Sequence, residues 1–108
     1  MDELERGLAL IRDGRYFDAH EELELVWRAA GVAERDFYQG LVHVAVAWYQ
    51  AGRGRPVATA SQLEKAARRL SAFAPAHRGV DVASVLAQVE TAQGVVRAGS
   101  LELDAPRV

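Results

Sequence analysis

Hydrophobic residues recur along this chain at intervals of three and four, the spacing that places side chains on one face of a helix. The pattern predicts five helices, over residues 2–13, 16–30, 33–51 and 56–73, and from just after residue 81 to about 98. Asp2 and Asp81 are candidate N-caps, Pro56 suits a first helical turn, and glycines follow several segments. Outside residues 101–104, no segment alternates as a strand does over more than four positions.

The third predicted helix is apolar almost all the way round, which is typical of a helix at the centre of a bundle. Gly40 and Ala47 would let a neighbouring helix come close, and they flank a single polar stripe of Asp36, Gln39, His43 and Gln50. Short connections favour antiparallel neighbours. We therefore predict an all-α fold, a five-helix bundle in one domain over residues 1–108. Residues 100–108 lack periodicity, and we expect a mobile tail there.

Two polar residues interrupt the apolar face of the second predicted helix. At about 100° per residue, His20 and Glu24 fall between Trp27 and Phe17 on that face. A histidine and a carboxylate that are removed from water need partners, or their burial costs roughly several kcal/mol. We predict that the second and third helices pack directly, with His20 and Glu24 turned toward the polar stripe of the third helix.

A structural polar network is the first interpretation of these residues. His20 would donate to Glu24 or to Gln39, and the network would fix the register of two packed helices. Glu21 lies nearer the solvent edge, beside Arg28, and is predicted to form a surface ion pair. The candidate polar cluster is His20, Glu21, Glu24, Gln39 and His43.

A metal site is the alternative interpretation. The segment HEELE, residues 20–24, resembles the zinc-protease pattern H-E-x-x-H with glutamate in place of the second histidine. His20 and Glu24 have the required spacing, and His43 could supply a third ligand. Such a set would suit Zn²⁺, Mn²⁺ or Fe²⁺. Otherwise the sequence indicates no cofactor.

Composition narrows the class of protein. The chain has 108 residues and no cysteine, which excludes disulfides and thiolate metal sites. Its net charge of −2 and the absence of a basic run argue against nucleic-acid binding. The longest apolar run is far below the ~20 residues of a membrane span, and no signal peptide is evident. We expect a cytoplasmic protein that does not bind membranes.

The segment YFDAHEELELVW, followed about ten residues later by FYQGLVHVAVAWYQ, resembles the prokaryotic domain-of-unknown-function family 309 over roughly residues 14–80. The matching positions are Phe17, Ala19, His20, Glu21, Leu23, Glu24, Trp27, Phe37, Gln39, Gly40 and Leu41. This resemblance implies an all-helical bundle and no established activity. Family members often carry histidine near Gln50, so a ligand at that position would be missing in this chain.

The sequence contains no complete nucleophile or acid–base set. We therefore expect a non-catalytic scaffold or interaction module, with a protein partner or a homodimer through the third helix or the exposed Leu25. The alternative is a metal-binding protein, or a metal-dependent hydrolase, that uses His20, Glu24 and His43. His77 lies in a predicted loop and is assigned no role, and Trp27 and Trp48 are expected in the core.

Overall fold

A computed structural model describes residues 2–108, and in this part of the chain the only regular elements are helices. They are α1 (Glu3–Arg12), α2 (Tyr16–Ala29), α3 (Val32–Gly52), α4 (Pro56–Leu70), the short 3₁₀ helix η1 (Ser71–Phe73) and α5 (Val82–Arg97). The all-α prediction is confirmed. Both predicted N-caps are present: the Asp2 carboxylate accepts from the amide of Glu5, and that of Asp81 accepts from Ser84.

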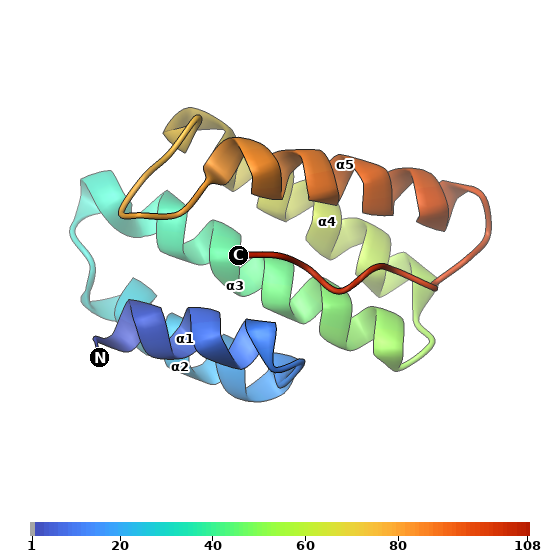
Figure 1. Ribbon diagram of the computed structural model, residues 1–108, viewed down its shortest axis with the longest axis horizontal. Coiled ribbons are helices and arrows are strands. Elements are labelled where there is room, and N and C mark those ends of the chain that lie inside the picture. Colours follow the sequence, from blue (N-terminus) through green and yellow to red (C-terminus); the bar gives the residue numbers. More distant parts are fainter. Residues whose placement is uncertain (1) are drawn as a thin grey trace.

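Successive helices alternate in direction, and α3 runs through the middle of the molecule (Figure 1). It packs against α2 on one side and α4 on the other, while α1 covers α2 and α5 covers α4. The central position predicted for the third helix is confirmed, because its buried residues include Phe37, Leu41, Val44, Ala45 and Trp48. Trp27 is partly buried and packs against this core.

Close contact between α3 and α4 depends on Gly40. A Cβ atom at this position would lie 2.5 Å from Cγ of Leu70, whose side chain is fully buried. The small residue predicted to admit a neighbouring helix therefore does so, and the neighbour is α4.

The connection between η1 and α5 is fastened to the start of α3. Glu34 accepts hydrogen bonds from Arg78 and from Nε2 of His77, the latter at 2.7 Å. The His77 ring also contacts Phe37 edge-on, with centroids 4.7 Å apart. His77, which the sequence left without a role, thus joins the loop to the core.

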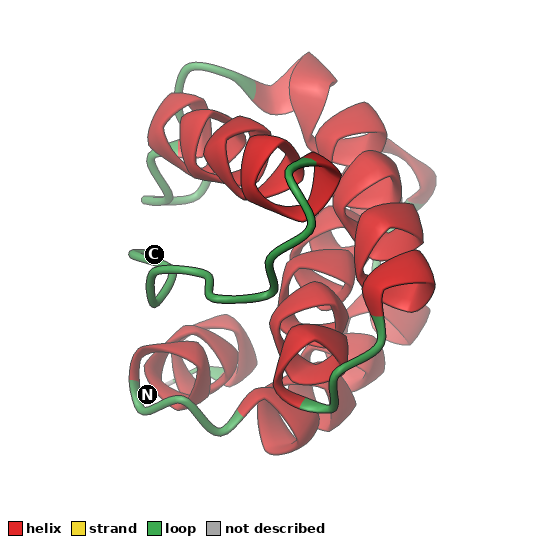
Figure 2. Ribbon diagram, turned by 90° about the vertical axis from the view of Figure 1, so that its right-hand side faces the viewer, coloured by secondary structure: helices red, strands yellow, loops and turns green. Residues whose placement is uncertain are grey.

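Residues 101–108, which we call the tail, have no helix or strand, yet they lie against the body of the protein. After α5 the chain turns back at Gly99 (φ +92°) and runs antiparallel to α5. Viewed from the end, the helices form an open arc around the tail (Figure 2). From the lack of periodicity we expected residues 100–108 to be a mobile tail, and the sequence gave no sign of this docking. Among the described residues, no helix is long and apolar enough to cross a bilayer.

Candidate functional site

The histidine–carboxylate pair of α2 forms, but at the surface. Nε2 of His20 lies 3.3 Å from Oε2 of Glu24, and Nδ1 lies 3.2 Å from the carbonyl oxygen of Phe17. The two side chains keep 27% and 30% of their exposure. Glu24 also accepts from Arg28, one turn later, at 3.4 Å. All these partners lie on α2 itself, so the pair is a local, partly hydrated arrangement.

An aromatic group adjoins this pair. Phe17 is half exposed, and its ring lies 5.4 Å from that of His20 and 5.5 Å from that of Tyr49 on α3. The guanidinium of Arg53 lies over the Tyr49 ring. The direct packing of α2 on α3 that the sequence predicts is confirmed.

The predicted contact of His20 and Glu24 with Gln39 and His43 is wrong. Nδ1–H of His43 donates to Oε1 of Gln62 at 2.7 Å, and Gln62 lies on α4. Within residues 2–108, no hydrogen bond or ion pair joins the α2 pair to Gln39 or His43. The polar stripe of α3 faces α4 at His43, a rotation about the helix axis that periodicity does not fix.

The ion pair predicted between Glu21 and Arg28 is also wrong. Arg28 instead bonds Glu24, which lies four residues before it on the same helical face. Glu21 is exposed, as the sequence indicates.

The predicted metal ligands do not assemble. His20 and Glu24 are together, whereas His43 is engaged with Gln62. In the described part of the chain, no group of three or more histidine, cysteine, aspartate or glutamate residues could hold a metal ion. A pair of ligands on one helix needs a third ligand from another element, and α3 does not provide it.

His43 lies in a partly dehydrated place between α3 and α4. Burial lowers the pKa of His43, the bond to Gln62 opposes that shift, and the positive charges of Lys65, Arg69 and Arg68 lower the pKa further. Its Nε2 atom is buried without a partner. The neutral imidazole therefore acts as a fixed link between two helices.

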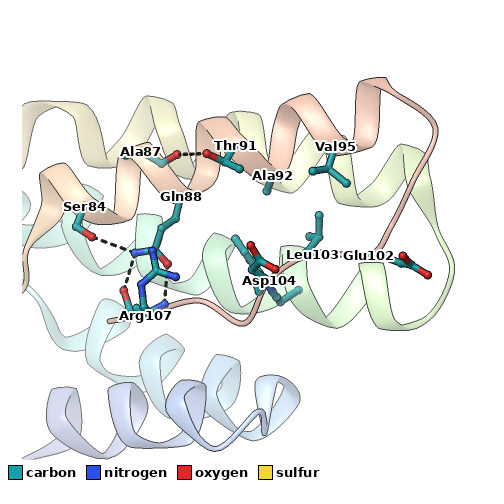
Figure 3. Close-up of a pocket in the computed structure, with 11 residues that line it drawn as sticks. Ser84, Ala87, Gln88, Thr91, Ala92, Val95, Glu102, Leu103, Asp104 and Arg107 are labelled. Carbon is teal, nitrogen blue, oxygen red and sulfur yellow. Dashed lines mark hydrogen bonds between the residues drawn. The ribbon is translucent and has the colours of Figure 1, made fainter.

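A second candidate site lies where the tail meets α5 (Figure 3). We call it the cleft; it is lined by one face of α5, by Trp48 of α3 and by the tail. The space left beside the tail is about 190 Å³, less than the roughly 300–1,000 Å³ of typical small-molecule sites. The tail itself is thus the main occupant of this cleft.

The rest of the protein, which we call the body, holds the tail through the tail's main-chain atoms. Gln88 pairs with both polar main-chain atoms of Arg107: its Nε2 donates to the carbonyl oxygen at 2.9 Å, and its Oε1 accepts from the amide at 2.7 Å. Trp48 Nε1 donates to the carbonyl of Asp104 at 2.8 Å, and Arg12 donates to that of Val108 at 3.2 Å. These four bonds use atoms that nearly every residue type offers.

Nonpolar tail residues complete the docking. Leu103 and Val108 pack against the core, and Pro106 is buried. The other residues of this stretch, Glu102, Asp104, Ala105 and Arg107, are exposed. We did not predict this site from the sequence; the only local signals were isolated aliphatic residues and a proline in an aperiodic segment.

Comparison with known proteins adds one match. A family model for a domain of unknown function, DUF309, matches residues 4–61, which span α1, α2, α3 and the start of α4. That range contains His20, Glu24 and Trp48, whereas Gln88 and the tail lie beyond it. No curated protein and no solved structure matches the chain. Because the match covers more than half of the 108 residues, the protein belongs to the DUF309 family.

Proposed function

We propose that this protein is a non-catalytic interaction module that binds an extended polypeptide segment in the cleft, and that its own tail occupies the cleft when no partner is bound. The observation that carries the proposal is the reciprocal pair between the Gln88 amide and the main chain of Arg107. The amide and carbonyl of one residue point the same way when that residue is extended. A side-chain amide that meets both is complementary to a polypeptide in this conformation.

Main-chain recognition distinguishes this cleft from an active site. Peptide-binding proteins that use an extended ligand gain affinity from main-chain hydrogen bonds and specificity from side-chain pockets. The cleft offers both: polar contacts from Gln88 and Trp48, and an apolar lining that includes Ala92 and Val95. Arg12, beside the cleft, adds a hydrogen bond to the main chain of Val108. The amide, indole and guanidinium groups that contact the tail are binding groups and form no acid–base or nucleophile set.

The first prediction concerns competition between the tail and an added peptide. Arg107→Pro removes the amide that donates to Gln88 and, because proline fixes the backbone angle φ, also disfavours the paired geometry. We expect the tail to be released, since the lost hydrogen bond contributes about 1 kcal/mol and the proline adds a conformational penalty. Since a larger share of molecules then has a free cleft, a fluorescent peptide with the sequence of residues 101–108 should bind about 10-fold more tightly than it does to wild type. Fluorescence anisotropy measures this in the full-length chain.

Two variants serve as controls. Arg107→Ala keeps the main-chain amide and should leave peptide binding at the wild-type level. Gln88→Ala, added to Arg107→Pro, removes the receptor group and should weaken the peptide again by about 10-fold. Circular dichroism confirms that each variant keeps its helices. Failure of Arg107→Pro to strengthen binding, or indifference to Gln88→Ala, would contradict the proposal.

A further inference from the structure

We infer that the cleft, together with the adjoining surface beside Arg12 and Asp81, selects its segment by three side-chain positions and is indifferent to the residues between them. Leu103 lies in the cleft, and Pro106 and Val108 lie on the adjoining surface. This inference rests on the proposed function and specifies the class of partner. The partner segment carries an aliphatic residue, a proline three positions later and a second aliphatic residue two positions after the proline. Three observations support this spacing.

The first selected position is that of Leu103. Its side chain lines the cleft together with Trp48, Ala92 and Val95, and it packs against the hydrophobic core. The Trp48 indole, which is only 6% exposed, also donates to the carbonyl of the next residue, Asp104. The main chain is therefore fixed directly beside the aliphatic side chain, and a polar group at this position would be placed in an apolar lining.

The second selected position is that of Pro106. It is buried although both of its neighbours are exposed. Proline has no amide hydrogen, so its burial leaves no main-chain donor without a partner. Any other residue would bring an N–H group to this buried place. Proline also restricts the unbound segment and so reduces the ordering that binding requires.

The third selected position is that of Val108. Its side chain packs against the core, and its carbonyl oxygen accepts from Arg12 of α1. Between the second and third positions, the side chain of Arg107 is exposed while its main chain pairs with Gln88. This position accepts every residue type except proline, which lacks the amide hydrogen that Gln88 receives.

The exposed positions carry no selection. Glu102, Asp104 and Ala105 are exposed, and no hydrogen bond or ion pair joins their side chains to the body within residues 2–108. All the polar contacts of the body with this part of the tail go to the main chain. The charge of the partner segment is therefore unimportant at these three places.

Competition binding tests this register with the full-length Arg107→Pro chain, whose cleft is open to added peptide. Unlabelled peptides of residues 101–108, each with one substitution, displace the labelled parent peptide. Leu103→Asp, Pro106→Ala and Val108→Asp should each raise the concentration for half-displacement by about 10-fold or more. Glu102→Ala, Asp104→Ala and Ala105→Ser are matched controls and should change it by less than about 3-fold.

The outcomes separate this inference from the proposed function. The register is wrong if the parent peptide binds and all substituted peptides compete equally. It is also wrong if a substitution at any one of the three positions leaves the concentration for half-displacement unchanged. In both cases main-chain binding stands. If a control position matters as much as the selected ones, the register is also wrong. If the labelled parent peptide does not bind the Arg107→Pro protein at all, the proposed function itself fails.

Discussion

At the scale of the residue, the burial of His43 and its bond to Gln62 together determine the protonation state of this histidine. Burial lowers the pKa of His43 below its ordinary value of 6.5. The unfolded chain therefore binds this proton more readily than the folded chain does. The stabilisation from the neutral imidazole is fully present above pH 6.5 and is lost as pH falls through the folded pKa.

We therefore expect the free energy of unfolding to fall more steeply between pH 7.5 and pH 5 in wild type than in His43→Gln. Glutamine keeps a donor for Gln62 and does not titrate. Urea unfolding at a series of pH values measures the difference, and the other two histidines are common to both proteins. Parallel pH profiles would contradict the assignment.

At the scale of the element, two glycines in helices should respond in opposite ways to alanine. Gly40→Ala brings a Cβ atom within 2.5 Å of the buried Leu70 side chain, so we expect α3 and α4 to be forced apart at a cost of about 1–3 kcal/mol. Gly94 has no atom within 4 Å of such a Cβ. Gly94→Ala should stabilise α5 by up to about 1 kcal/mol through helix propensity alone.

Thermal and urea unfolding of the two variants test this pair. The same chemical change is made in two helices, so the contrast isolates the contact between α3 and α4. A Gly40→Ala protein as stable as wild type would show that the helices can separate without cost.

At the scale of the whole molecule, the tail links three helices, α1, α3 and α5, none of which packs extensively against another. It bonds to Arg12 of α1, Trp48 of α3 and Gln88 of α5. Trp48→Phe keeps an aromatic ring but removes the indole donor to Asp104. We expect the amide protons of the tail to exchange with solvent about 5-fold faster in this variant, because one hydrogen bond contributes about 1 kcal/mol.

Trp27→Phe is the matched control, since Trp27 lies on α2 and contacts no tail residue through its indole nitrogen in the described structure. Hydrogen exchange measured by mass spectrometry resolves the tail from the helices. Equal exchange of the tail in the two variants would show that the indole bond does not hold it.

Local sequence determined the helices of this protein. The signals that form them act within a few residues: apolar spacing, the N-cap residues Asp2 and Asp81, and the glycines at the turns. The all-α fold and the central position of α3 could therefore be predicted from the sequence. The motif around His20 was enough to suggest the family.

The tertiary structure alone decided which side chains meet. Periodicity places His43 on a face of α3, but the rotation of that helix makes Gln62, and not His20, its partner. The tail has no local signal because its contacts are distant in sequence: Trp48 and Asp104 are 56 residues apart. Such contacts depend on the packing of the whole chain, and a short segment carries no trace of them.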